Sequence, residues 1–418
     1  MKRSNASKIL MSLGLAGVLL GAASIAQASA FQIWEQDAAG IGDYHAGAAA
    51  EANTAATEFY NPAGLTRLGH QQLSLGATSI STLVRFTGTV AGAQGQANGG
   101  VLKFIPNLHY ALPINDNWAF GFGITVPFGL ETDYPSSSVA ANYSTKTSLE
   151  TINLNPSIAY KINSHLSLGF GLDAQYLTAD FDNFVADQIK DKNSGNSWGY
   201  GWNMGLLLQM NKNTRFGFSY RSQIRQHLKG TGTVTDTSLT PPIDAKSDNL
   251  KANLTMPATT MLGAFHRFKC GWSILGNVTY TQWSVFKNLT LTNLPTAGGV
   301  LPSFMTVPQN FKDTWNFAFG AHYRFNSRWT LKLGTGYDIT PTNTKDRNLR
   351  MPDANRYALA AGGEYRFNKS FAVDAGYMHL FIDKAKINNT PTDPNLAPSN
   401  GHVKSLANIY GVQVIWTV

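Results

Sequence analysis

The chain has 418 residues, a formal net charge of +8 and 14% charged residues, and it is rich in glycine (39) and aromatic residues (23 Phe, 16 Tyr, 9 Trp). The single cysteine, Cys270, excludes an intramolecular disulfide. Three basic residues lie in the first ten positions. Without them the chain has 30 basic and 25 acidic residues, a small and dispersed excess that argues against nucleic acid binding.

The first thirty residues have the pattern of a secretory signal peptide. Three basic residues precede an apolar stretch, residues 9–25, and the small residues 28–30 (Ala-Ser-Ala) follow it. This order directs export and ends at a cleavage site. We therefore predict that residues 1–30 are removed and that Phe31 begins the exported protein. The alternative, an N-terminal membrane anchor, lacks a charged stop-transfer flank.

Residues 31–70 form a second segment, which we predict to be a compact, partly helical plug inside a barrel and call the hatch. They lack strand alternation, contain alanine runs compatible with helices, and include Asn61-Pro62, where proline restricts the backbone of both residues. A disordered tail is generally poor in large apolar residues. This segment instead carries Phe31, Ile33, Trp34, Phe59, Tyr60 and Leu65.

Residues 71–418 have the pattern of an all-β transmembrane barrel. Short polar turns, five of the six centred on asparagine, interrupt runs of alternating apolar residues at 114–117, 162–165, 211–214, 268–271, 325–328 and 367–370. Short turns on one side and long loops on the other are typical of outer-membrane barrels. After the signal, no apolar run reaches the 18 residues of a membrane helix, so a closed barrel is the remaining way to span. We expect fourteen antiparallel strands, at residues 71–88, 102–112, 118–129, 148–161, 166–180, 198–210, 215–230, 250–267, 272–291, 311–324, 329–340, 355–366, 371–383 and 404–418.

The strands are regular enough to assign faces. Because strand side chains alternate with a period of two, the eleventh strand should direct one set toward lipid, namely Trp329, Leu331, Leu333 and Tyr337. The opposite set should face the lumen: Lys332, Gly334, Gly336 and Asp338. In the last strand we assign the following residues to lipid: Tyr410, Val412, Val414, Trp416 and Val418.

The seventh strand carries a basic ladder of one parity, formed by Arg215, Arg221, Arg225 and Lys229. An unpaired cation facing mid-membrane lipid costs about 2 to 4 kcal/mol, so we expect the ladder to face the lumen. It then either contacts an anionic head group or, as we favour, pairs with lumenal acids such as Asp173, Asp338 and Asp374.

Several short motifs occur in a fixed order along the chain: Phe31-Gln32-Ile33 with Glu35, Gly40-Ile41-Gly42, Ala46-Gly47, Asn61-Pro62-Ala63, Gly129-Leu130-Glu131-Thr132, and Leu149-Glu150-Thr151-Ile152-Asn153-Leu154-Asn155. Each motif is weak alone. Their order, from the hatch to the fourth strand, resembles the FadL-type long-chain fatty acid transporter family of Gram-negative outer membranes, and the similarity extends to the last strand.

The resemblance implies a mechanism. Members of that family are fourteen-stranded barrels blocked by the hatch. Hydrophobic substrate is captured at an extracellular groove, passes to an inner pocket near the mature N-terminus, and leaves sideways through a gap at a kinked third strand. In this chain the third strand contains Pro127, Phe128 and Gly129. Proline cannot donate a ladder hydrogen bond and glycine weakens a strand, so pairing is expected to fail there. A simple strand end entering a loop is the alternative.

The resemblance also suggests residues that contact the substrate. In the groove these are Phe181, Phe184, Val185 and Ile189, in a long loop expected after the fifth strand, and Leu239 and Ile243, in a loop expected before the eighth. Phe31 is the candidate for the inner pocket. Fatty-acid members present a basic residue near the end of the fifth strand, where this chain has no cation in residues 178–183 (TADFDN), although Lys190 and Lys192 follow. A fatty acid and an aromatic or alkane hydrocarbon both stay open as substrates.

Such uptake needs no cofactor, because each CH₂ removed from water contributes about 0.8 kcal/mol. We expect a monomer in the Gram-negative outer membrane, in contact with membrane lipid. An enzyme, such as an outer-membrane lipase, is disfavoured because the sequence contains neither H-E-x-x-H nor G-x-S-x-G. A general porin needs an open, charge-lined channel, and the aromatic residues of the hatch argue against it.

Overall fold

The computed structural model of the protein describes residues 30–186, 188–299, 301–391 and 396–418. The predicted signal peptide, residues 1–30, therefore lies outside the described residues except for Ala30. Within the described ranges, no helix has both the length and the hydropathy to cross a membrane.

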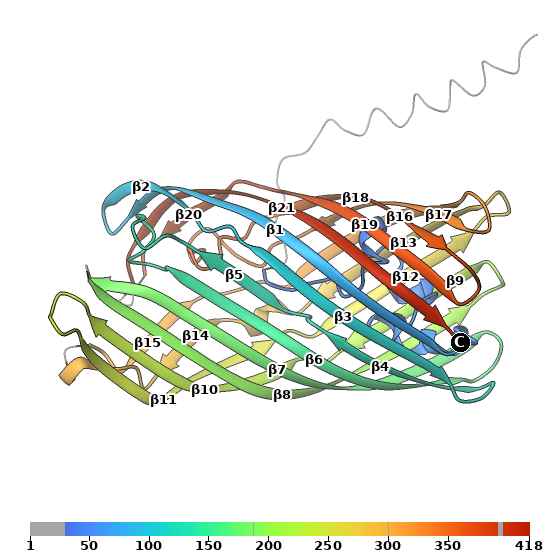
Figure 1. Cartoon of the computed structure of the whole chain (residues 1–418), viewed down its shortest axis with the longest axis horizontal. Coiled ribbons are helices and arrows are strands. Elements are labelled where there is room, and N and C mark those ends of the chain that lie inside the picture. The colour runs from blue at the N-terminus through green and yellow to red at the C-terminus, as the bar shows by residue number, and fades with distance from the viewer. Residues whose placement is uncertain (1–29, 187, 300, 392–395) are drawn as a thin grey trace, which may run out of the picture.

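The strands form one closed antiparallel barrel of 14 wall strands (Figure 1). Several wall strands consist of two consecutive segments. In chain order the wall contains β1 (Gln72–Val90), β2 (Ala93–Asn98) with β3 (Leu102–Pro113), β4 (Trp118–Thr125) with β5 (Gly129–Asp133), β6 (Lys146–Lys161), β7 (Leu166–Ala186), β8 (Ile189–Gln209), β9 (Thr214–Arg221) with β10 (Ile224–Asp236), β11 (Ile243–Met256) with β12 (Thr259–Arg267), β13 (Trp272–Thr281) with β14 (Asn288–Thr292), β15 (Phe304–Pro308) with β16 (Thr314–Arg324), β17 (Trp329–Asp338), β18 (Arg356–Arg366), β19 (Phe371–Ile382) with β20 (Ala385–Asn389), and β21 (Ser399–Thr417).

The first and last strands close the barrel. β1 pairs with β21 from Gln72 opposite Thr417 to Val90 opposite Ser399. The predicted strand order is confirmed, but several strands are longer than expected. In particular, the loop predicted after the fifth strand is wrong, because β7 continues to Ala186 and β8 already begins at Ile189. In the described part of the chain, two short 3₁₀ helices occur outside the hatch: η3 (Trp283–Val285) lies between β13 and β14, and η4 (Ala297–Gly299) lies between β14 and β15.

The asparagine turns have a common structure. At five turns the asparagine Oδ1 accepts hydrogen bonds of 2.8–3.0 Å from the N–H groups two and three residues later, at Asn115, Asn163, Asn211, Asn326 and Asn368. Asparagine is favoured here because its side chain replaces a backbone acceptor. The C-terminal strand ends at the same side, since the Thr417 N–H donates to the Ser370 carbonyl oxygen.

The predicted faces of the eleventh and last strands are confirmed. Leu333 is 58% exposed on the outer face, whereas the adjacent Lys332 is 5% exposed in the lumen. In β21, Tyr410, Val412 and Trp416 are exposed and Gln413 is fully buried.

The basic ladder is divided by a break in its strand. Arg215 is buried and Arg221 partly buried on the lumen side, but β9 ends at Arg221 and β10 begins at Ile224. Beyond this break the alternation shifts, so Arg225 and Lys229 are exposed on the outer face. The prediction that all four face the lumen is therefore wrong for Arg225 and Lys229. Outward cations are tolerated near the membrane interface, where their cost falls to about 0–1 kcal/mol.

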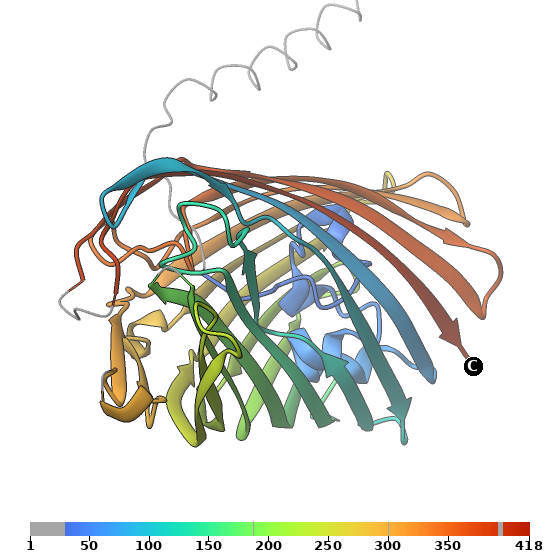
Figure 2. The ribbon, with the colours of Figure 1, turned by 60° about the vertical axis from the view of Figure 1, so that its left-hand side comes forward.

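The hatch fills part of the barrel interior, where Figure 2 shows it as the blue coil between the walls. It contains η1 (Ile41–Asp43), α2 (Ala48–Glu51), α3 (Thr57–Tyr60) and η2 (Pro62–Arg67). Most of its side chains are buried, including Ile41 and Leu65. The predicted partly helical plug is present.

Candidate functional site

The Asn61-Pro62-Ala63 motif attaches the hatch to the wall. The Asn61 side-chain amide donates to the carbonyl oxygens of Ala49 (2.6 Å) and Leu206 (3.0 Å), and its oxygen accepts from the Ala63 N–H (3.1 Å). A glycine on β7 permits this approach, because a Cβ at Gly169 would lie 2.3 Å from the Ala63 nitrogen. In the structure this motif therefore fixes the hatch to the barrel wall.

The two lumenal ladder residues also bind the hatch. Arg215 donates to two main-chain oxygens of α2, at 2.9 and 2.7 Å. Arg221 donates to the Phe59 carbonyl oxygen (2.9 Å) and forms an ion pair with Asp173. The pairing with Asp173 agrees with the favoured prediction, whereas the other two predicted acids pair elsewhere: Asp338 with Arg356 (2.9 Å) and Asp374 with Lys332 (2.7 Å).

Two wall histidines face hatch carboxylates. His109 Nδ1 lies 2.9 Å from Glu58, and His322 lies 2.6 Å from Asp43 and 3.3 Å from Glu51. Burial raises the pKa of Glu58. Asp43, Glu51 and His322 are the one group of described residues whose ligand atoms are close enough to share a metal ion. Because both ring nitrogens of His322 already face a carboxylate, hydrogen-bonded attachment of the hatch accounts for this group.

The start of the hatch pairs with an interruption in the third wall strand. β4 ends at Thr125 and β5 begins at Gly129. The Ile33 N–H donates to the Pro127 carbonyl oxygen, and the Gly129 N–H donates to the Phe31 carbonyl oxygen, each at 2.9 Å. Ladder pairing between wall strands therefore fails at the predicted proline, and hatch residues supply replacement partners.

Phe31 lies in an aromatic cluster beside this interruption. Its ring centroid is 4.7 Å from that of Trp283, 5.8 Å from Phe286 and 6.0 Å from Phe128, in edge-to-face arrangements. Phe31 is 3% exposed. Edge-to-face pairs contribute about 0.5–1.5 kcal/mol each beyond apolar burial, so this cluster holds the beginning of the hatch.

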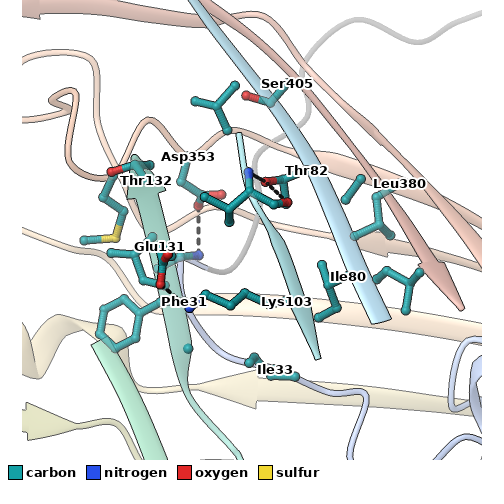
Figure 3. A pocket seen from close by; sticks show the side chains of 18 of the residues that line it. Phe31, Ile33, Ile80, Thr82, Lys103, Glu131, Thr132, Asp353, Leu380 and Ser405 are labelled. Atoms are coloured by element: carbon teal, nitrogen blue, oxygen red, sulfur yellow. Dashed lines mark hydrogen bonds and ion pairs between the residues drawn. The ribbon is translucent and has the colours of Figure 1, made fainter. Parts of the chain in front are cut away.

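A cavity of about 220 Å³ lies between the hatch and the wall (Figure 3). Phe31 and Ile33 line it from the hatch, and Ile80 and Leu380 line it from β1 and β19. Of the three predicted exit residues, Gly129 lines this cavity, while Pro127 and Phe128 line a smaller neighbouring pocket. Most of the lining is apolar, which suits a hydrophobic ligand.

The cavity reaches a window in the wall between β3 and β5. β3 pairs with β4 only from Leu108 to Pro113, and β5 pairs with β6. Above the window the Asp133 N–H donates to the Gly99 carbonyl oxygen (3.2 Å). The cavity lining includes Phe104, which is 70% exposed on the outer face. The cavity thus extends from the lumen into the wall.

The connection between β17 and β18 folds into the lumen and contributes Asp353 to the cavity. One Asp353 carboxylate oxygen accepts from the Ala30 N–H (2.8 Å) and from the Thr340 hydroxyl. Burial raises the pKa of Asp353 to about 7. Sequence reasoning missed this residue, because an acid in a connection predicted to be extracellular gives no sign of an inward position.

The residues predicted for the outer groove do not come together in one pocket. Phe181 points inward and is buried, packed with the apolar core that includes Leu228 and Leu250. Ile189 and Ile243 flank Asp236 on two strands that pair with β10. These two residues, together with Phe184, Val185 and Leu239, are half-buried or exposed at the hairpin ends. The groove assignment stays a prediction for Phe181, Phe184, Val185, Ile189, Leu239 and Ile243.

Although residues 178–183 contain no cation, a buried cation from elsewhere in the chain lies near the end of the fifth strand. Arg350, from the β17–β18 connection, donates to the Asn183 side-chain oxygen (3.0 Å) and to the Thr147 hydroxyl (3.0 Å). Its guanidinium lies 5.8 Å from the Phe181 ring centroid. The sequence could not reveal it, because Arg350 is distant along the chain from the strand whose end it occupies.

Comparisons with known proteins agree with this architecture. Residues 19–417 match the family model described as outer membrane protein transport protein (OMPP1/FadL/TodX). A long-chain fatty acid transport protein of Escherichia coli (strain K12) is 30% identical, over 88% of this chain and 91% of that protein. Outer membrane protein P1 of Haemophilus influenzae is 28% identical, over 96% and 97% of the two chains.

Solved structures share the fold. The crystal structure of a Pseudomonas aeruginosa FadL homologue has a TM-score of 0.84 and 22% identity, with 93% of this chain and 99% of that chain covered. The Ralstonia pickettii toluene transporter TbuX has a TM-score of 0.69 and 20% identity, with 91% and 99% covered. Together with the family match over nearly the whole sequence, these findings place this outer-membrane barrel in the OMPP1/FadL/TodX family of transport proteins.

Proposed function

We propose that this protein is a passive uptake channel for small hydrophobic molecules, with long-chain fatty acids as its substrates. The observation that carries the proposal is the apolar cavity that begins beside Phe31, inside a barrel blocked by the hatch, and extends to the wall window. An acyl chain enters such a cavity because each buried CH₂ contributes about 0.8 kcal/mol. The curated relative in Escherichia coli (strain K12), named for long-chain fatty acid transport, supports the same substrate class.

In the proposed route the substrate leaves sideways, through the window between β3 and β5. The interruption at residues 126–128 supports this route. On the side of β3, hatch residues and not a wall strand complete the hydrogen bonding, while Thr151 of β6 bonds Phe128 on the other side. A hydrophobic molecule that leaves through the wall enters lipid and does not cross the aqueous periplasm unprotected. The barrel closes within one chain, so the proposed unit is a monomer surrounded by outer-membrane lipid.

The proposed function requires neither a cofactor nor catalysis, because burial of apolar surface supplies the driving force. Family members are described as transport proteins, which supports a transporter that is not an enzyme.

An uncharged aromatic or alkane hydrocarbon is the second candidate substrate. Among the described residues, the two cations that line the cavity are both paired with acids, Arg356 with Asp338 and Lys103 with Glu131. A cavity without a free cation accepts an uncharged ligand. The fold is also that of the Ralstonia pickettii toluene transporter.

Uptake by cells tests the proposal directly. Labelled oleate, toluene and a small sugar are supplied to cells that carry or lack this protein, with matched amounts of folded barrel. We expect a selective gain for oleate. A gain for toluene alone assigns the second candidate substrate, and a gain only for sugar contradicts both.

A further inference from the structure

The wall window has defined edges and one ion pair across it. Backbone pairing closes its lower edge at Leu108 opposite Ile124, and the hydrogen bond from Asp133 to Gly99 closes its upper edge. Among the ion pairs of the described residues, the pair between Lys103 of β3 and Glu131 of β5 is the one that joins these two strands (Figure 3).

The two charged groups meet from opposite faces of their strands, because Glu131 adjoins the buried Thr132 and so has the outer parity of β5. By alternation Lys103 points to the lumen side, between the exposed Leu102 and Phe104. Glu131 lies opposite Ser148 of β6, whose hydroxyl donates to its carboxylate (3.3 Å). The Lys103 side chain is 44% exposed and the Glu131 side chain 13%. The ammonium group is therefore reachable from the cavity, while the carboxylate is held against β6.

The position of the Lys103–Glu131 pair along the membrane normal matches that of the head group of an amphiphile. Lys103 lies on β3 far from the periplasmic turn at residues 114–117. With a rise of about 3.3 Å per residue and a strand tilt of about 40°, it stands roughly 25–30 Å above that turn. The apolar band of such barrels is about 25 Å tall, so the pair lies near the outer boundary of the hydrocarbon. A fatty acid in a bilayer places its carboxylate at this level.

We propose that Lys103 and Glu131 form a carboxylate-operated latch across the window, so that the exit discriminates fatty acids from uncharged hydrocarbons. The inference rests on the proposed function and narrows its substrate class. The carboxylate of a bound fatty acid replaces Glu131 on the Lys103 ammonium, and the released Glu131 keeps Ser148 and gains water. The window is then crossed by no ion pair.

The exchange is selective because the Lys103 ammonium keeps a carboxylate partner throughout. One carboxylate replaces another on the same ammonium, and the Ser148 hydroxyl and water compensate the displaced Glu131 carboxylate. An uncharged hydrocarbon brings no replacement, and to pass it must separate Lys103 from Glu131 without compensation. Charge-assisted hydrogen bonds are roughly twice as strong as neutral ones, and the apolar surroundings strengthen them further.

The other charged groups near the cavity do not provide this function. Arg356 is only 18% exposed and is paired with Asp338 (2.9 Å). Asp353, Glu35 and Glu150 are acids and carry the wrong charge to hold a carboxylate. Among the described cavity-lining residues, Lys103 is the cation with substantial exposure.

Three variants test the latch. Lys103→Met keeps the length of the side chain and removes the charge, Glu131→Gln removes the competing carboxylate, and the double exchange Lys103→Glu with Glu131→Lys restores a cation and the ion pair. Initial uptake rates of labelled oleate and toluene are measured for each. Lys212→Met, in an exposed periplasmic turn, is the matched control, and heat-modifiable gel mobility confirms equal amounts of folded barrel.

The latch predicts opposite effects on the two ligands. Lys103→Met should lower oleate uptake about tenfold, as expected for loss of one hydrogen bond to a charged group. It should raise toluene uptake, because no ion pair then crosses the window. Glu131→Gln should raise toluene uptake and leave oleate uptake at least at the wild-type rate. The double exchange should recover most of the oleate uptake.

Two results would overturn the latch while leaving the channel function intact. One is wild-type oleate uptake by folded Lys103→Met. The other is a parallel loss of oleate and toluene uptake in both single variants, which indicates a structural brace. Failure of the wild-type protein to take up either ligand instead refutes the proposed function itself.

Discussion

Gln36 of the hatch and Val126 of the wall are joined by two reciprocal hydrogen bonds. The Gln36 amide donates to the Val126 carbonyl oxygen (2.8 Å), and the Val126 N–H donates to the Gln36 side-chain oxygen (2.7 Å). The Gln36 side chain thereby supplies the donor and the acceptor that a neighbouring strand supplies elsewhere in the wall. Because buried backbone groups must be paired, the position of the hatch and the closure of the third strand are physically linked.

Replacing Gln36 should loosen this link. Gln36→Leu leaves the Val126 N–H and carbonyl oxygen without partners, at a cost of about 1–3 kcal/mol for each buried group. We expect faster hydrogen exchange in residues 126–133 and a lower thermal midpoint. The control is Gln96→Leu, because Gln96 is exposed on β2. Wild-type exchange at residues 126–133 in Gln36→Leu would show that the bonds contribute nothing to closure.

Straightening the third strand should reduce uptake. Pro127→Ala restores a backbone donor, and Gly129→Ala favours the extended strand. The added Cβ at Gly129 meets the end of the flexible Ile33 side chain at 2.6 Å, which can shift. We expect the double variant to assemble normally and to take up oleate more slowly. Unchanged uptake by correctly inserted protein would refute sideways exit at this point.

Truncating Phe31 should destabilise the start of the hatch. Phe31→Ala removes a buried ring from a cluster with Trp283 and Phe286, and core truncations of this kind cost about 3–5 kcal/mol. Oleate binding and uptake should fall, and proteolysis near the N-terminus should increase. Phe325→Ala is the control, because Phe325 is 67% exposed in a turn. Equal behaviour of the two variants would exclude Phe31 from the binding site.

The divided ladder predicts unequal effects of charge removal. Arg221→Met leaves Asp173 buried without its cation, and breaking a buried pair costs about 3–5 kcal/mol. Lys229→Met changes an exposed outer residue, so its effect should stay within about 0.5 kcal/mol. Thermal unfolding in detergent measures both. Similar losses would mean that the break between β9 and β10 does not separate the faces.

Asp353 should make stability depend on pH. In the chain that retains residues 1–30, burial raises its folded-state pKa from 3.8 to about 7, so the folded state binds more protons than the unfolded state between these values. Stability should therefore fall as pH rises from about 4 to 7 and level off above. Asp353→Asn should remove this component of the pH dependence. A wild-type pH profile in the variant would assign the dependence to other groups.

The barrel could be predicted from the amino-acid sequence, because membrane-spanning strands alternate inward and outward side chains and their turns are tight. Both features are visible in short stretches of sequence: asparagine occurs at five turns, and the polar Lys332 is followed by the apolar Leu333. The failure of strand pairing at Pro127 also follows from a property of one residue, the missing N–H.

Contacts between distant segments became visible in the folded barrel alone. Arg225 and Lys229 face outward because the short break between β9 and β10 shifts the alternation of side chains. No single residue in the sequence predicts this break. Asp353 and Arg350 enter the lumen on a long connection, and Lys103 meets Glu131 across strands that do not pair. Turns and alternation are local consequences of the backbone, whereas contacts across the lumen and the window depend on how the closed barrel places distant segments.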